Sequence, residues 1–578
     1  MFVGCLVVLT TAGLCAEEAE GSLDPVKETL QGAPKVLEIV RHDTSPPLRE
    51  LMKLDVPERK QVKIYRDPTG PPELNTLPED WQGSYGVRFS EHVEQNQAMS
   101  RAAMPTPDVN VLGLGVGQPG YSLDGVPPDT TGGVGRDYYI QWVNTDYAFF
   151  NKDDGSMVDL PGSNWRPGNV LWSGFGGLCE YTNYGDPIAL YDQLADRWVL
   201  TQFGLAAAAS GPHSQCVAVS ETSDPLGSWH RYEYVWPDNY LNDYPKMGIW
   251  SDGYYFSANE FSCSSWSNCA WLGAAVAVME RDAMMQGAPA SVQYWSLSSG
   301  YGHLLPADVD GDAPPPPGAP GLYVAANSSY VNDGLHFWRA SIDWDNPNNS
   351  TFGLNGNAPN TSIDVTNYFE GPDIPQPGTA YELDAMNDRL MFRAPYRNFG
   401  THESLVLTQT VKSGSSSDLG QRWYEIRDPG SDTPILYQEG TYAPAGESRW
   451  MGSIAMDALG NISLGYSVSG SSTSPSIRVV GRNHDDPLGQ MTYSEGEIQT
   501  GSGYQIPMGG RNRWGDYSTM SIDPSDDCTF WYTQEFIQNT GNMVWRTKIA
   551  SYAFPECREL MDFIFKDGFE SGDTTAWD

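Results

Sequence analysis

The sequence has few basic residues. Lys and Arg number 34 against 73 Asp and Glu, and the formal net charge is −39. A strongly acidic surface repels nucleic acids and anionic membranes, which argues against both as partners. Charged residues make up only 19% of the chain, whereas it holds 60 glycines and 12% aromatic residues. This composition predicts an all-β, turn-rich fold and not a disordered chain.

Long apolar runs are also scarce, and the one of note lies at the start. Residues 2–16 are uncharged and mostly apolar, and the acidic segment 17–20 follows them. Residues 1–16 are therefore predicted to be a secretory signal peptide, with a buried strand as the alternative. Leu14 is larger than the usual small residue there, which also disfavours a lipoprotein signal at Cys15. No later stretch is long and apolar enough to span a bilayer.

Cysteines are few, and none shows the CxxC spacing of a zinc or redox site. Beyond the predicted signal peptide there are six: Cys179, Cys216, Cys263, Cys269, Cys528 and Cys557. An even number in an exported protein predicts disulfides, for which several connectivities are possible. Proximity along the chain favours Cys179–Cys216, Cys263–Cys269 and Cys528–Cys557.

The two ends of the chain differ from its middle. Residues 17–110 have weak apolar periodicity and several prolines, which predicts an extended N-terminal arm or pro-segment. It would hold a few strands, as at 36–40 and 62–65, and a short helix near 48–54. Residues 559–578 are too polar for a core strand and are predicted to be a C-terminal tail, either frayed or acting as a tag for export or surface attachment.

The middle of the chain repeats one pattern: an aromatic residue, a short apolar strand, an Asp/Gly/Asn turn and a second apolar strand. The pattern is clearest at 244–256, 381–392, 450–462 and 514–530. Further starts lie near Tyr138, Ile188 and Leu304, so that seven can be counted at spacings of roughly 50–80 residues. Radial sheets protect their edges from pairing with other chains. We therefore predict a β-propeller of seven four-stranded blades over residues 111–558. Six or eight blades, or an array of β-sandwiches, are the alternatives.

Several local motifs resemble those of a group of secreted, mostly uncharacterised bacterial β-propeller proteins. They are Pro127–Gly135, Asp192–Trp198, Arg513–Ser518 and Asp527–Thr533. The ending, Asp567–Asp573 followed by Ala576 and Trp577, resembles a tail found on exported proteins of some Gram-negative bacteria. The resemblance implies a propeller that is secreted, extracellular or on the outer cell surface. It implies no activity.

One acidic loop has the spacing of metal ligands. Asp308, Asp310 and Asp312 alternate, with Gly311 allowing a tight bend, so their oxygens could converge on one Ca²⁺. A full EF-hand loop would carry Glu at the twelfth position, where this chain has Ala319. A solvated acidic turn is the alternative to a partial calcium site.

Two of the repeat starts pair arginine with tryptophan. Arg449–Trp450 and Arg513–Trp514, with Asp516, are candidate ligand-binding residues for an anionic sugar or a carboxylate in the central channel. Asp129, Asp186 and Asp243 occupy comparable positions. The alternative is structural, with Arg–Asp pairs between blades and Trp packed between sheets. Most of the aromatic residues are expected to fill the core, because adjacent blades bury large faces against each other.

Catalytic motifs are absent from the sequence. It has no HExxH, no GxSxG and no P-loop, and its eight histidines are scattered. The first functional hypothesis is therefore a secreted or cell-surface propeller that binds a glycan or a protein without catalysis. The alternative is an extracellular polysaccharide lyase or glycoside hydrolase, whose acid and base residues would converge in the central funnel from several blades. A cluster of Arg, Tyr, His and paired carboxylates there would favour the enzyme.

Overall fold

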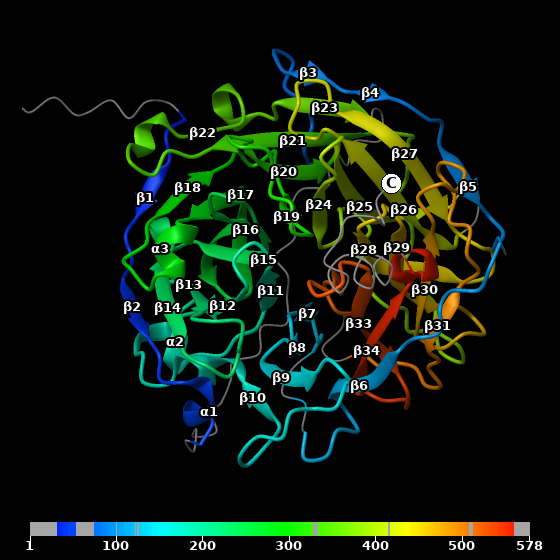
Figure 1. Cartoon of the computed structure of the whole chain (residues 1–578), viewed down its shortest axis with the longest axis horizontal. Coiled ribbons are helices and arrows are strands. Elements are labelled where there is room, and N and C mark those ends of the chain that lie inside the picture. Colours follow the sequence, from blue (N-terminus) through cyan, green and yellow to red (C-terminus); the bar gives the residue numbers. More distant parts are fainter. Residues whose placement is uncertain are drawn as a thin grey trace, which may run out of the picture.

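The computed structural model describes residues 32–53, 74–99, 101–121, 123, 126–327, 333–413, 417–507 and 512–559. The predicted signal peptide and all but the first residue of the predicted tail lie outside these ranges, as does the strand expected at 62–65. The described chain is all-β: antiparallel sheets are arranged radially round a common centre, as in a β-propeller (Figure 1).

Each sheet is built from strands that follow one another in the chain. The first three sheets are formed by β7 (Thr130–Val134), β8 (Tyr138–Val143), β9 (Asp146–Asn151) and β10 (Trp165–Pro167); by β11 (Ile188–Asp192), β12 (Arg197–Gly204), β13 (Ser214–Ser220) and β14 (Trp229–Val235); and by β15 (Leu241–Ile249), β16 (Tyr254–Ser265), β17 (Asn268–Met279) and β18 (Val292–Ser296). Gly, Asp and Asn turns join the strands, as the repeat pattern predicts.

The next sheet has twelve strands, of which three come from the N-terminal arm and nine form two antiparallel halves joined by a parallel pairing. One half holds β19 (Leu305–Val309), β20 (Gly321–Ala326), β21 (Gly334–Ser341), β22 (Thr351–Phe352) and β23 (Thr361–Asp364), and the other holds β24 (Ala394–Asn398), β25 (Glu403–Lys412), β26 (Leu419–Arg427) and β27 (Ile435–Tyr442). The parallel pairing is between β19 and β24.

Two four-stranded sheets complete the ring. They are β28 (Ser448–Met456), β29 (Ile462–Ser469), β30 (Ser476–Arg482) and β31 (Gly496–Gln499), then β32 (Thr519–Ile522), β33 (Thr529–Ile537), β34 (Trp545–Ala553) and β6 (Val109–Gly115). Because β6 precedes every other strand of the ring and pairs with the last one, the ring is closed by hydrogen bonds between distant parts of the chain. The first strands contact one another in the cyclic order β7, β11, β15, β19, β24, β28, β32 and back to β7.

The N-terminal arm adds strands to the outer edges of the sheets. These are β1 (Lys35–Leu37) on β18, β2 (Arg41–Thr44) on β14, β3 (Ser84–Tyr85) on β23, and both β4 (Val87–Arg88) and β5 (Val93–Gln95) on β27. The arm follows the perimeter of the ring (Figure 1). Exposed sheet edges invite pairing with other chains, and the arm covers several of them.

Helices are few and short in the described ranges. They are α1 (Leu48–Leu51), α2 (Gly177–Tyr181) and α3 (Arg281–Met285), with the 3₁₀ turns η1 (Gly168–Trp172), η2 (Pro237–Asn239), η3 (Pro347–Asn349) and η4 (Asn355–Asn357). Residues 555–559, which follow β34, are also helical. The helix α1 lies within the segment where a short helix was expected. Among the described residues, the model has no helix with the length and apolar character needed to cross a membrane.

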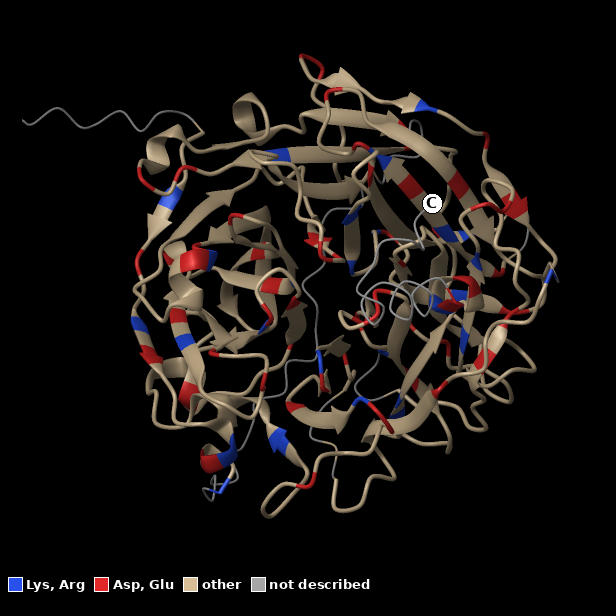
Figure 2. Cartoon of the chain, viewed as in Figure 1, with Lys and Arg blue, Asp and Glu red and all other residues tan. Residues whose placement is uncertain are grey.

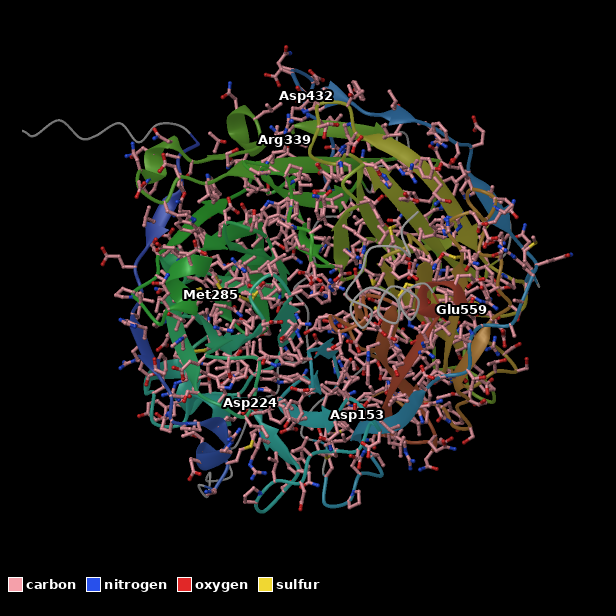
Figure 3. All side chains as sticks on the ribbon, in the orientation of Figure 1. Asp153, Asp224, Met285, Arg339, Asp432 and Glu559 are labelled. Carbon is pink, nitrogen blue, oxygen red and sulfur yellow. A yellow bond between two sulfur atoms is a disulfide. The ribbon has the colours of Figure 1, made fainter. Side chains whose placement is uncertain are left out.

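Tryptophans fill the space between the sheets, in which side chains are densely packed (Figure 3). Twelve of them are almost completely buried. Trp450 and Trp514, for example, lie at the starts of neighbouring sheets with ring centroids 5.3 Å apart. This confirms that most of the tryptophans belong to the core.

The three predicted disulfides are present. Cys179 pairs with Cys216, Cys263 with Cys269, and Cys528 with Cys557. The first ties α2 to β13, the second links β16 and β17 near their hairpin turn, and the third ties the chain just after β34 to the start of β33. Such bonds persist in oxidising compartments.

Candidate active site

A left-handed backbone recurs within or shortly before the first strand of a sheet. The residues concerned are not glycine: Asp129, Asp186, Tyr244, His303, Met386 and Met451, with φ between 41° and 56°. This region of backbone space is unfavourable for most side chains, and Asp and Asn tolerate it best. Two β-bulges accompany it, between Asp243 and Lys246 in β15 and between Trp450 and Ser453 in β28. A bulge redirects side chains, and bulges are frequent beside active sites.

These entry points bring charged side chains together. Asp186 lies near Asp129, Asp243 and Asp516, and Lys246 lies near Asp186 and Asp516. We call the charged residues gathered there the central cluster: Asp129, Asp186, Asp243, Lys246, Arg389, Arg513, Asp516 and Glu535. Figure 2 shows acidic and basic positions at the middle of the ring as well as on its rim.

Asp129 and Asp516 connect the first and last sheets of the ring. The backbone N–H of Asp516 donates to Asp129 Oδ1 over 2.9 Å, and Asn144 Nδ2 donates to Asp129 Oδ2 over 2.7 Å. Both aspartates are buried. Burial, and next the nearby carboxylate of Asp516, raise the pKa of Asp129 well above its usual value. The neutral acid is therefore the favoured form of Asp129.

Glu535 lies on β33 behind this pair. It is buried, and its Oε1 accepts a hydrogen bond from the backbone N–H of Gly515. Burial raises the pKa of Glu535 well above its usual value, and the charges of Asp129 and Asp516 add to the effect. The cluster therefore holds a second carboxyl group that favours the neutral form.

Asp186 is one of the members of the cluster that are only partly buried. Its pKa is nevertheless raised well above the usual value, first by loss of hydration and then by Asp243 and Asp129. Asp243 is also partly buried. A partly accessible carboxyl group that favours its protonated form has the properties of a general acid.

A buried lysine lies among these carboxyl groups. Lys246 Nζ is 3.3 Å from the centroid of the Tyr244 ring and 4.3 Å from that of Tyr517, and it donates to the carbonyl of Pro245 over 2.9 Å. Burial lowers the pKa of Lys246 to about 7, against the opposing effect of Asp186. Lys246 is thus a cation held on aromatic faces that can lose its proton near neutral pH.

Two arginines supply further positive charge. Arg513 forms an ion pair with Asp516, and its Nε lies 3.8 Å from Asp384 Oδ2. Arg389 pairs with Asp388 at 2.7 Å, and its guanidinium lies 4.8 Å from the centroid of the Tyr244 ring. An arginine beside a carboxylate favours the ionised form of that carboxylate.

A neutral histidine lies beside the arginine. His303 Nε2 is 3.9 Å from Asp388 Oδ2. Burial and then Arg389 lower the pKa of His303 to about 3, which keeps its ring neutral at physiological pH. The arrangement therefore combines Arg, Tyr, His and carboxyl groups of both kinds, neutral and ionised.

The predicted ligand-binding residues separate into two places. Arg513 and Asp516 belong to the central cluster. Arg449 does not: its side chain is buried and pairs with Glu495 at 2.8 Å, beside the outer strand β31. Trp450 and Trp514 are buried and pack on each other. Asp129, Asp186 and Asp243, noted in the sequence as comparable starts, lie in the cluster.

The predicted calcium ligands face a side-chain cation. Asp308 and Asp310 are buried, and each forms an ion pair of 2.5 Å with Arg393, whereas Asp312 is exposed. Asp308 Oδ1 also accepts the backbone N–H of Ile249 over 2.9 Å. In the described part of the chain no group of three or more His, Cys, Asp or Glu side chains is placed to hold a metal ion. Calcium binding stays a prediction.

Four residues of the site were not predicted from the sequence to be functional: Tyr244, Lys246, Arg389 and Glu535. Tyr244 and Lys246 flank Pro245 inside a repeat start, and the bulge that turns them to the centre is visible only in the fold. Glu535 comes from a second strand, where nothing distinguishes it in sequence. Arg389 lies within the segment 381–392, which was expected to form a strand, a turn and a second strand. Comparison of all the repeat starts residue by residue could have found Lys246.

No protein-family model matches the chain, and no curated protein matches it by sequence. Solved structures similar to it include a protein of unknown function from Dyadobacter fermentans, with 11% identity, 63% of this chain and 93% of the other covered, and a TM-score of 0.33. An α-L-arabinofuranosidase from Fusarium graminearum shows 9% identity, coverage of 79% and 100%, and a TM-score of 0.31. An α-L-arabinanase from Penicillium chrysogenum shows 9% identity, coverage of 55% and 95%, and a TM-score of 0.26. Likenesses at these TM-scores carry no argument about this chain.

Proposed function

We propose that the chain is an extracellular enzyme that hydrolyses glycosidic bonds of a polysaccharide, with the central cluster as its active site. The observation that carries the proposal is a pair of carboxyl groups in contrasting environments. Asp186 is partly accessible and its pKa is raised, whereas Asp516 is paired with Arg513. One protonated and one ionised carboxyl group on either side of a glycosidic bond is the arrangement that glycoside hydrolysis requires.

Each of these two groups has a defined task in the reaction. The acid Asp186 gives its proton to the glycosidic oxygen as the bond from that oxygen to the sugar carbon breaks. The ionised Asp516 supports the positive charge that develops on the sugar, either by attacking the carbon or by taking a proton from the attacking water. Asp129 and Glu535 both favour the neutral form. Asp516, which forms an ion pair with Arg513, is therefore the carboxyl group of these three that we expect to be ionised.

A lyase is the second candidate, and Lys246 is the observation that favours it. An amine with a pKa of about 7 can remove a proton from the carbon next to a uronic acid carboxylate. Arg389 and Arg513 would neutralise that carboxylate. We place the hydrolase first because its proton donor, Asp186, is partly exposed, whereas the base of the lyase, Lys246, is buried against two tyrosine rings. The second carboxyl group of the hydrolase, Asp516, is buried like Lys246. Binding without catalysis stays a prediction, and the mixed cluster favours the enzyme over it.

The finer features of the fold belong to the same proposal. We count seven four-stranded blades, because seven first strands contact one another in a closed cycle. The twelve-stranded sheet then comprises two blades joined by the pairing of β19 with β24. Three disulfides and the apolar residues 2–16 support secretion. The kinship with secreted bacterial propellers and the attachment role of the tail are likewise proposals.

The experiment is a product assay on the secreted chain. The protein is incubated with neutral polysaccharides (glucans, xylans, mannans and arabinans) and with acidic ones (pectate and alginate). New reducing ends without unsaturated sugars are the expected result. Unsaturated ends would establish the lyase instead. Binding of a polysaccharide with no product from any of them would establish the non-catalytic reading and overturn the proposal.

A further inference from the structure

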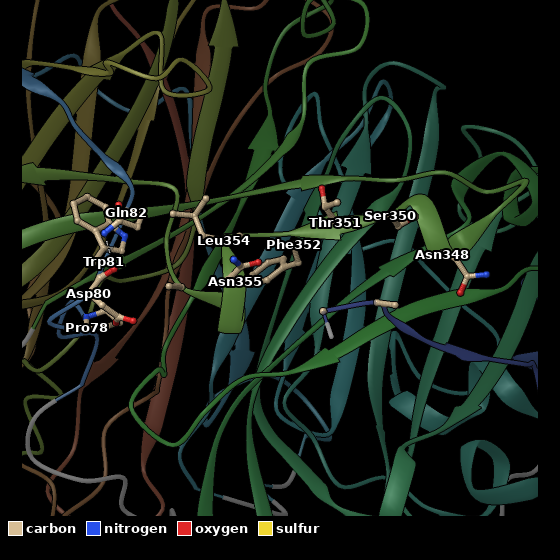
Figure 4. Close-up of a pocket in the computed structure, with 14 residues that line it drawn as sticks. Pro78, Asp80, Trp81, Gln82, Asn348, Ser350, Thr351, Phe352, Leu354 and Asn355 are labelled. Atoms are coloured by element: carbon tan, nitrogen blue, oxygen red, sulfur yellow. Dashed lines mark hydrogen bonds between the residues drawn. The ribbon is translucent and has the colours of Figure 1, made fainter. Parts of the chain in front are cut away.

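A groove lies on the rim of the ring, between the N-terminal arm and the loop around β22, and encloses about 490 Å³. The arm contributes Asp80, Trp81 and Gln82, and the loop contributes Asn348, Thr351 and Asn355. Figure 4 shows Trp81 at one end of the groove and Asn348 at the other. This volume falls within the range of small-molecule sites, and the groove has length as well as depth.

Trp81 is held in place and remains partly exposed. Its indole N–H donates to the carbonyl of Pro359 over 2.7 Å, and its ring meets that of Tyr85 edge-on at 5.1 Å. A second part of the arm that lines the groove is also fixed, because Trp295 Nε1 donates to the carbonyl of Gly32 over 3.0 Å. The groove is therefore formed before any ligand arrives, so that little ordering is needed on binding.

Aromatic rings continue from the groove along the arm. Tyr85 is 57% exposed and Phe89 is 65% exposed, with Val87 between them at 51%. Residues two apart in an extended chain share one face, so all three point outwards together. Phe89 stacks on Tyr437 of β27 with ring centroids 5.1 Å apart. Soluble proteins seldom leave a row of large apolar side chains exposed without an interaction that uses it.

The charges beside the groove argue for a neutral ligand. Arg339 is paired with Asp432 at 2.7 Å, and both are labelled in the upper part of Figure 3. Arg88 is paired with Glu439 at 2.5 Å. The groove itself carries Asp80 and the amides of Gln82 and Asn355, in a chain of net charge −39. An anionic polymer would be repelled, whereas hydroxyl groups could bond to the amides and the carboxylate.

We propose that the rim groove and the aromatic row that leads from it bind a neutral oligosaccharide chain. Sugar rings would stack on Trp81 and Tyr85, and the groove amides would receive and donate hydrogen bonds to hydroxyl groups. The groove lies at the periphery, beside β3 and β22, away from the entry points of β7, β11 and β15 at the centre (Figure 1). Binding there therefore does not depend on the proposed hydrolysis and would anchor the enzyme to a polymer.

The test is calorimetric titration of the full secreted chain with cellohexaose, xylohexaose and mannohexaose, carried out in an Asp186→Asn background so that no probe is consumed. Trp81→Ala is expected to weaken the binding of at least one hexasaccharide about tenfold or more, as loss of a stacked ring implies. Asn355→Ala, an exposed change on the other wall, should weaken the same binding without disturbing the packing of the arm. Tyr181→Ala removes a tyrosine on α2 that is about as exposed as Tyr85, far from the groove in sequence, and should change nothing.

Three results would overturn the inference, two of them in the titrations with the neutral probes. One is the absence of binding by all three hexasaccharides, and the other is binding that neither Trp81→Ala nor Asn355→Ala alters. Tighter binding of an oligogalacturonate than of every neutral probe would also contradict it. Failure of the hydrolase proposal would appear as the absence of new reducing ends in the product assay. The rim variants are not used in that assay, so the two failures can be distinguished.

Discussion

Gly515 donates its backbone N–H to Oε1 of Glu535, and in the part of the chain that the structure describes Oε2 of Glu535 has no partner. A carboxylate anion in that position would be buried without compensation. The relationship therefore agrees with a raised pKa for Glu535 and identifies it as a neutral acid inside the central cluster.

Replacement of Glu535 by Gln tests that assignment. The amide keeps the acceptor for Gly515, so we expect the free energy of unfolding to change by less than about 1 kcal/mol at acidic pH. In the wild type the native state holds the proton and the unfolded state loses it above about pH 4.5, so wild-type stability falls as pH rises. The Glu535→Gln variant has no proton to lose at this position. Its free energy of unfolding should therefore rise relative to that of the wild type between about pH 5 and pH 8.

Urea unfolding at the two pH values measures the difference. Glu535→Leu is the matched control, because it leaves the Gly515 N–H unpaired and should cost about 1–3 kcal/mol at both. A Glu535→Gln variant that loses stability relative to the wild type as pH rises would show that the glutamate is ionised.

The pH profile of kcat/KM tests the state of Asp186. A general acid works only when protonated, and the pKa of Asp186 is raised by burial and by its acidic neighbours. Activity on the best polysaccharide should therefore persist well above about pH 4, the usual aspartate value, and fall only at higher pH. The falling limb belongs to the coupled cluster as a whole. An enzyme already inactivated on raising the pH from about 4 to about 5 would contradict this assignment.

Arg393 is expected to be a major source of stability. Arg393→Met leaves Asp308 and Asp310 buried without their cation, which should lower the free energy of unfolding by about 3–5 kcal/mol. Arg136→Met breaks an exposed pair with Asp196 and should cost less than about 1 kcal/mol. Urea unfolding of the two variants, with and without Ca²⁺, makes the comparison. Equal losses in the free energy of unfolding for the two variants would contradict the expectation. If Ca²⁺ restores the stability of Arg393→Met and not that of Arg136→Met, the calcium prediction is supported.

The disulfides should differ in their contribution to stability. Cys528 and Cys557 are 29 residues apart in sequence, and Cys263 and Cys269 only six. A cross-link restricts the unfolded chain more when its loop is longer, so replacing the first pair by alanines should cost about 3 kcal/mol or more and replacing the second pair distinctly less. Denaturant unfolding of the two double variants measures both costs. The reverse order would contradict the expectation.

Much of the fold could be predicted because it follows from local patterns. The segment 450–462 contains the end of β28, a turn and the start of β29, as expected. The first repeat start was placed one strand late, since Tyr138 begins β8 and the ring opens with β7. The prediction at 381–392 was wrong: Leu383 and Leu390 form isolated bridges there, and the strand β24 begins at Ala394. Buried apolar residues give the same sequence pattern whether their backbone forms a continuous β-ladder or only isolated bridges.

The site was less predictable because it depends on contacts between distant segments. Asp129 and Asp516 are 387 residues apart in the chain and meet only when the ring closes. The sequence identified both as repeat starts, together with Asp186, but nothing local placed Lys246 on two tyrosine rings. Arg449 shows that a shared motif does not ensure a shared position. It precedes a tryptophan as Arg513 does, but it pairs with Glu495 at the outer strand of its own sheet and does not reach the cluster.

The most direct test of the proposed activity is the turnover of Asp186→Asn on whichever polysaccharide the wild type degrades. Loss of the proton donor should lower kcat about 10²–10⁴-fold while the binding of substrate and the melting temperature stay near the wild-type values. Asp238→Asn, an exposed aspartate that pairs with Lys35 on the rim, is the matched control and should be fully active. An Asp186→Asn variant with wild-type turnover would contradict the account and remove the central cluster as the site of hydrolysis.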